Sequence, residues 1–121
     1  FGAGLLDALG QVVVDRQPTL LIAYDSEYPE PLHSKRPLPD VAGIALLLTP
    51  ERGARALASI TARLDEDAPA TLADPALETL RATVPALRGL PLLELLARSE
   101  AGSVGLDYLP PLQLRVDLQP C

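Results

Sequence analysis

The residues that could do chemistry gather in one loop, which follows a short apolar stretch. The loop runs from Tyr24 to Asp40 and is rich in prolines and charged residues. It holds two of the three tyrosines, the single histidine and the single lysine of the chain. Functional loops and merely long loops have the same composition, so a binding role and a structural role both stay open. The candidate pocket or partner-binding residues are Tyr24, Asp25, Tyr28, His33, Lys35 and Arg36.

Known catalytic arrangements cannot be assembled from these residues. Because His33 is the one histidine, neither a catalytic triad nor a multi-histidine metal site can form. His33 itself is either an ordinary loop histidine or a group for binding or proton transfer. No serine lies in a G-x-S-x-G context. We therefore expect no catalytic residue, no metal and no cofactor in this chain.

Charge and cysteine content narrow the possible partners and surroundings. The net charge of −6 argues against a nucleic-acid partner, which requires a basic face. The acidic run at 65–67 is interpreted as a solvated loop. Cys121 is the one cysteine, so no internal disulfide can form, and a reducing cytoplasm is expected. No uninterrupted apolar run reaches the roughly 18 residues that a membrane span needs.

The elements that must position the loop are a helix and two apolar strands. The pattern predicts a helix over 1–15, ended before Pro18, and strands over 19–23 and 42–48. Both strands are apolar on both faces, which predicts a sheet covered by helices on each side. The loop then leaves the carboxyl end of a buried strand, where α/β sheets place ligand sites. Gly2 and Gly4 in the first turn are interpreted as allowing close helix packing, because no visible strand precedes them as in a phosphate loop.

The second half of the chain predicts further helices and strands. A half-exposed strand is expected over 56–64 and a terminal strand pair over 103–108 and 112–118. Helices are expected over 75–83 and 90–98, the first capped by Asp74 with a proline at its first position. We expect one α/β domain over 1–121, with a core at 1–64, a helical segment at 74–99 and a strand pair at 103–118. The first helix has no Ser, Thr or Asp cap, which suggests the later part of a larger domain.

Two stretches carry a resemblance to a known family. They are the run from FGAGLLDALG through AYDSEYPEPLHSKRP to ALASI, and the ending LLELLA, LDYL and LQLRVDLQPC. Together they resemble the C-terminal half of β-ketoacyl-synthase-like, chain-length-factor-like proteins of aryl-polyene and related fatty-acid-type gene clusters. The resemblance is strong over 1–60 and at the end of the chain, and weak over 65–80.

The resemblance implies a thiolase-like layered fold, with a mixed sheet and helices, that lacks its N-terminal strands here. In true synthases the helix matching 1–15 carries the acyl-accepting cysteine just before its first turn, where the helix N-terminus favours the thiolate. That position would fall before Phe1. The two histidines that assist decarboxylation belong to the other half of the fold, and His33 matches neither.

Three readings of function remain open. The first is a non-catalytic partner that pairs with an active ketosynthase and helps to shape its acyl pocket. The second is a condensing enzyme whose cysteine lies before Phe1, and the third is an unrelated acidic α/β domain. The expected partners are the N-terminal half of the same protein, a second copy or a ketosynthase, and an acyl carrier protein. The residue about three positions before Phe1 in the parent gene separates the first two readings.

Overall fold

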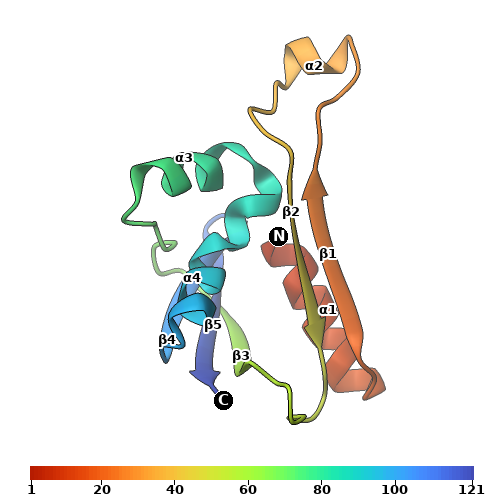
Figure 1. Ribbon diagram of the computed structural model, residues 1–121, viewed down its shortest axis with the longest axis vertical. Helices are drawn as coiled ribbons and strands as arrows, with labels where there is room; N and C mark the ends of the chain where they lie inside the picture. The colour runs from red at the N-terminus through yellow and green to blue at the C-terminus, as the bar shows by residue number, and fades with distance from the viewer.

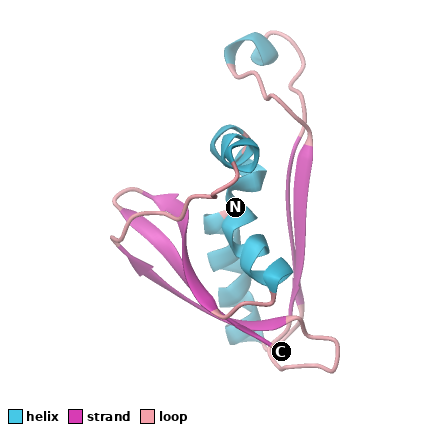
Figure 2. Cartoon of the chain, turned by 60° about the vertical axis from the view of Figure 1, so that its left-hand side comes forward, coloured by secondary structure: helices cyan, strands magenta, loops and turns pink.

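The computed structural model describes residues 1–121 as a mixed α/β unit of four α-helices and five strands. The strands form two separate sheets, and every pairing in them is antiparallel. In Figure 2 the two sheets meet near the lower end of the molecule, and the helices lie between them except for one short helix in the projecting loop at the top. The α/β class predicted from the sequence is confirmed, but these residues alone form no mixed sheet.

The first helix, α1 (Gly2–Asp15), begins one residue after its predicted start, ends at its predicted end and runs between the sheets. It ends at Arg16, which adopts a left-handed conformation with φ 56° before the chain reaches Pro18. A Cβ atom added at Gly2 would lie 2.3 Å from the backbone oxygen of Asp107. At Gly4 an added Cβ would lie 3.3 Å from the side chain of Leu21. The interpretation of these glycines as packing residues is therefore confirmed.

The two predicted apolar strands, β1 (Thr19–Asp25) and β2 (Ala42–Leu48), form a two-stranded antiparallel hairpin. Thr19 pairs with Leu48 at one end and Asp25 with Ala42 at the other. The connecting loop contains one short helix, α2 (Leu32–Lys35), and projects beyond the rest of the molecule (Figure 1).

The prediction that β1 and β2 are buried on both faces is wrong, since every second residue of each strand is exposed. The side chains of β1 alternate between partly buried and exposed, and Leu20 and Ile22 are 58% and 59% exposed. The inner face packs towards α1, whereas no element of the chain covers the outer face (Figure 2). An apolar sequence shows that a strand can be buried on both sides, but the covering segments decide whether it is.

The second sheet contains three strands in the order β3-β5-β4. They are β3 (Ala58–Asp65), β4 (Gly102–Leu109) and β5 (Leu112–Pro120), each within three residues of its predicted bounds. β3 pairs with β5 over its whole length, from Ala58 opposite Pro120 to Asp65 opposite Gln113. The expected core at 1–64 is thus divided between the sheets, because β3 joins the terminal strand pair and not β1 or β2.

The predicted helical segment forms α3 (Pro75–Thr83), a 3-10 turn η1 (Pro85–Gly89) and α4 (Leu90–Arg98). The carboxylate of Asp74 accepts hydrogen bonds from the backbone N–H groups of Ala76 and Leu77, as the capping signal predicted. α4 ends at Ser99, which is left-handed with φ 52°.

One apolar core joins the layers. Buried side chains of α1, α4, β4 and β5 form its centre, and leucines from the inner face of the β1–β2 hairpin pack against it. Burial of these aliphatic side chains is the main stabilising term, at roughly 25 cal/mol per Å² of apolar surface. No helix is both long and apolar enough to cross a bilayer. The fully buried members of the centre are Leu5, Leu92, Leu106, Leu114, Val116 and Leu118.

Candidate functional site

An open cavity of about 290 Å³ lies where the amino end of α1 meets the end of β1 and the start of η1. Strand β1 contributes one wall with residues 22–25, and η1 contributes the opposite wall with Pro85 and Ala86. Phe1 also lines the cavity. Five of its seven lining residues are hydrophobic, which is compatible with the hydrocarbon part of a ligand.

Asp25 is the one charged side chain in this wall. Its Oδ2 atom accepts a hydrogen bond of 2.6 Å from the backbone N–H of Ala86, 61 residues away in the sequence. This bond connects β1 to the first turn of η1 and satisfies a donor at its N-terminus. Asp25 therefore has a structural task and also adds a negative charge to the cavity.

The structure brings two of the six candidate residues to this cavity, namely Tyr24 and Asp25. Tyr24 is 74% exposed and lines the cavity. The other four, Tyr28, His33, Lys35 and Arg36, lie in the projecting loop around α2 and line neither of the cavities described here. None of the six side chains forms a hydrogen bond or an ion pair with another of the six.

The projecting loop has its own local organisation. Glu30 accepts hydrogen bonds from the hydroxyl and the backbone N–H of Ser34, the first at 2.7 Å. His33 Nδ1 is buried and has no hydrogen-bond partner. Lys35 and Arg36 are exposed and unpaired, so the loop presents two cations on an otherwise acidic chain.

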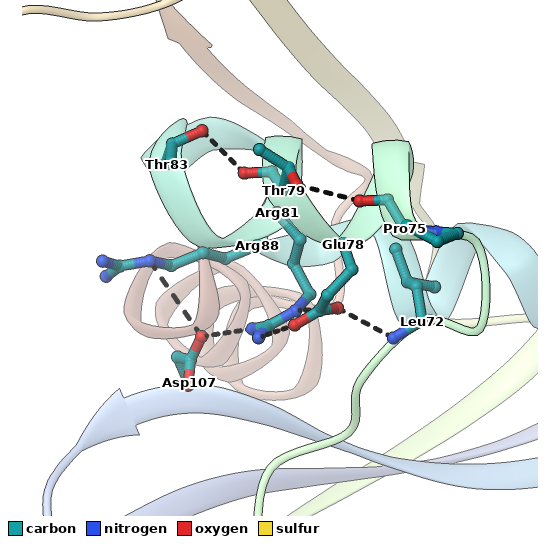
Figure 3. A network of polar contacts seen from close by, with 8 residues as sticks. All are labelled: Leu72, Pro75, Glu78, Thr79, Arg81, Thr83, Arg88 and Asp107. Atoms are coloured by element: carbon teal, nitrogen blue, oxygen red, sulfur yellow. Dashed lines mark hydrogen bonds and ion pairs between the residues drawn. The ribbon is translucent and has the colours of Figure 1, made fainter.

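The most extensive polar contacts lie elsewhere, between α3 and β4, at residues that the sequence analysis did not select (Figure 3). The guanidinium of Arg81 donates to both carboxylate oxygens of Glu78, at 2.9 and 2.6 Å, and to Asp107 at 2.9 Å. Glu78 also accepts from the backbone N–H of Leu72 at 2.8 Å. The Arg81 hydrogen bond, followed by that of Leu72, lowers the pKa of Glu78 to about 2.

A second cavity, of about 340 Å³, lies beside these contacts. Its wall contains two arginines, Arg81 and Arg88, and one carboxylate, Asp107. Gln113 of β5 also lines it, and its side-chain oxygen is buried without a hydrogen-bond partner. Two of its seven lining residues are hydrophobic, against five of seven in the cavity at the end of α1.

The acidic run at 65–67 is only partly the solvated loop that was expected. Arg115 donates to Asp65 at 3.0 Å and lies 3.5 Å from the exposed carboxylate of Asp67. The hydrogen bond from Arg115 lowers the pKa of Asp65. Asp65 thus fixes the end of β3 against β5. No three His, Cys, Asp or Glu side chains of the chain converge as a metal site would require.

One of these contacts, the ion pair within α3, could have been predicted from the sequence. Glu78 and Arg81 are three residues apart on a capped helix, which places them side by side. The contacts of this pair with Leu72 and Asp107 depend on how α3 packs on β4, and no local pattern specifies that.

Comparison of the chain with protein-family models, with curated proteins and with solved structures finds no match. The α/β class therefore rests on the structure alone. The assignment of a family and of a function rests on the resemblance in the sequence and on the two cavities, and is argued below as a proposal.

Proposed function

We propose that this chain belongs to a β-ketoacyl-synthase-like protein that acts as a non-catalytic, chain-length-factor-like partner of an active ketosynthase. The proposal includes the thiolase-like layered fold that the resemblance implies. In that fold the upstream half of the protein would cover the outer face of β1 and β2. Two observations support the proposal: α1 packs against the inner face of the hairpin, and the outer face is apolar and uncovered.

The observation that carries the proposal is the cavity at the amino end of α1. The resemblance puts the acyl-accepting position of true synthases just before this helix. Five of the seven residues that line this open cavity are hydrophobic, which is compatible with the wall of an acyl-chain path, and its one charged side chain is Asp25. A carboxylate beside a cysteine disfavours the thiolate, which opposes nucleophilic catalysis there. This arrangement favours shaping an acyl pocket over forming an acyl-enzyme.

Condensation by this protein itself is the competing function, with a cysteine supplied by the segment before Phe1. It is favoured by one feature, the helix N-terminus at the cavity, since a helix dipole lowers the pKa of a thiol. The two functions differ in a measurable product, because only a condensing enzyme gains the mass of an acyl group.

The test uses the protein encoded by the parent gene, alone and together with the ketosynthase of its cluster. Incubated alone with acyl-loaded carrier protein, it should show no acyl adduct by intact-mass spectrometry, and it should co-purify with the ketosynthase. An acyl adduct on the protein alone would establish the condensing enzyme instead. Failure both to co-purify and to be acylated would favour the unrelated α/β domain.

A variant pair tests the role of the cavity within that complex. Tyr24→Ala removes an exposed side chain from the cavity wall and should shift the products towards longer chains. Tyr28→Ala is the matched control, because Tyr28 lies in the projecting loop and outside the cavity. Equal product lengths in the two variants would show that the cavity does not line the path of the acyl chain.

A further inference from the structure

Helix α3 is attached to the rest of the molecule in a different way from the other long helices. Buried leucines fix α1 and α4 to the core, namely Leu5 and Leu92. In residues 73–83, which include the whole of α3, no side chain is buried and none packs against the core. A segment that buries so little apolar surface belongs to the least stable part of a fold.

Polar contacts take the place of this packing (Figure 3). Glu78 accepts a hydrogen bond of 2.8 Å from the backbone N–H of Leu72, and Arg81 donates one of 2.9 Å to Asp107. Arg81 also donates to Glu78, which joins the two contacts in one chain of hydrogen bonds. The other hydrogen-bonded side chains of the segment bond only within it, and these are Asp74, Thr79 and Thr83.

The chain is anchored on both sides of this segment. Before it, Leu72 is buried, and the backbone N–H of Ala70 donates to the backbone oxygen of Gly105 in β4 at 2.8 Å. After it, Val84 is fully buried, and Ala86 donates to Asp25. Residues 73–83 can therefore leave their place while the chain at either end stays fixed.

Such an opening leaves no buried charge without a partner. The side chains of Glu78 and Arg81 pass into water, and Asp107 keeps Arg88 at 4.0 Å. A helix of nine residues is too short to be stable alone in water, so α3 loses its backbone hydrogen bonds when it leaves β4. Exchange of these amide hydrogens therefore reports directly on the opening.

We propose that residues 73–83 form a flap that opens by local unfolding, and that the hydrogen bonds of Glu78 and Arg81 are the latch that holds it closed. Arg81 and Ala82 of the flap line the cavity of about 340 Å³ beside β4. This cavity therefore has its full wall only while the flap is closed. The flap is separate from the cavity at α1 and does not depend on the function proposed there.

The test is amide hydrogen exchange of the 121-residue chain, followed by NMR at several low urea concentrations. The hydrogen-bonded amides of α3 should exchange at least about tenfold faster than those at the centre of β5, around the fully buried Val116. Exchange in α3 should depend little on urea, because a local opening exposes little surface. Exchange in β5 should depend steeply on urea, because it requires global unfolding.

Two variants weaken the latch, and the spectra report whether each one is folded. Arg81→Gln removes the ion pair with Asp107 and should speed exchange in α3 about tenfold. Glu78→Gln keeps an acceptor for Leu72 but removes the charge, and should have a smaller effect in the same direction. Arg98→Gln is the matched control, because Arg98 forms a surface ion pair on α4, and it should leave exchange in α3 unchanged.

A variant outside the flap separates local from global opening. Ile60 packs against the core from β3, and this contact stays intact when only the flap opens. Ile60→Val should therefore speed exchange in β5 about threefold or more and leave exchange in α3 unchanged.

Three results would overturn the proposal. If α3 and β5 show the same urea dependence, or if Ile60→Val speeds exchange in both equally, α3 opens only with the whole fold. If neither latch variant changes exchange in α3, the helix frays in place and Glu78 and Arg81 do not hold it.

Discussion

At the scale of single residues, two glycines of α1 lead to opposite predictions. Gly2→Ala should destabilise the fold by about 1–3 kcal/mol, because the new Cβ would lie 2.3 Å from the backbone oxygen of Asp107. Gly10→Ala should stabilise it by about 0.5–1 kcal/mol, because Gly10 has open space around it and alanine favours a helix. Urea unfolding of both variants measures the difference, and stabilisation by both would show that α1 can move away from β4.

Glu78 gives a second prediction at this scale, concerning acid stability. Its folded pKa, about 2, lies below its ordinary value of 4.5, so the unfolded chain binds more protons between these two pH values. The stabilisation from Glu78 is therefore complete above about pH 4.5 and is lost as the pH falls towards 2. Urea midpoints from pH 5 to pH 2 should fall less steeply in Glu78→Gln than in the wild type. Glu100→Gln, at an exposed position, serves as the control and should follow the wild-type curve.

At the scale of elements, the N-cap of α3 is the clearest case in which the local sequence determines where a helix begins. Asp74→Ala removes the acceptor for the backbone N–H groups of Ala76 and Leu77 and should cost about 1 kcal/mol. Asp40→Ala is the comparison, because its carboxylate accepts only from the adjacent Val41 in an exposed loop. Thermal unfolding should separate the two variants, and equal effects would mean that the cap contributes nothing beyond its charge.

The same scale explains which parts of the structure could be predicted from the sequence. Helix α3 and strand β5 carry local signals, a cap before a proline and a strict alternation, and both formed where expected. The pairing of β3 with β5 joins residues about 50 positions apart, and no local sequence pattern predicts it. The contact of Arg81 with Asp107 is of the same kind. Of the six candidate site residues, the adjacent pair Tyr24 and Asp25 line the cavity at α1, and the loop residues do not.

At the scale of the whole molecule, the two sheets differ in their outer faces. The outer face of the three-stranded sheet carries ion pairs such as those of Arg63 with Asp117 and Arg115 with Asp65. The outer face of the β1–β2 hairpin contains no charged side chain. The hairpin has seven residue pairs, so its outer face is about 23 Å long and about 10 Å wide, an area of about 230 Å². This area is far below the ~800 Å² that each partner buries in a stable interface. This face alone cannot hold a specific dimer, but it favours weak association.

The last prediction compares the two faces of this hairpin through two cross-strand pairs. Leu20 and Leu47 lie opposite each other on the outer face and are 58% and 68% exposed, whereas Leu21 and Leu46 lie opposite each other on the inner face and pack on the core. Replacing the outer pair by threonine should leave the urea midpoint nearly unchanged and reduce light scattering at high protein concentration, because threonine keeps the strand propensity and removes apolar surface. Replacing the inner pair should destabilise the fold by about 2 kcal/mol or more. An equal loss of stability in the two double variants would show that the outer face is covered in solution, and the next step would then be to identify the segment that covers it.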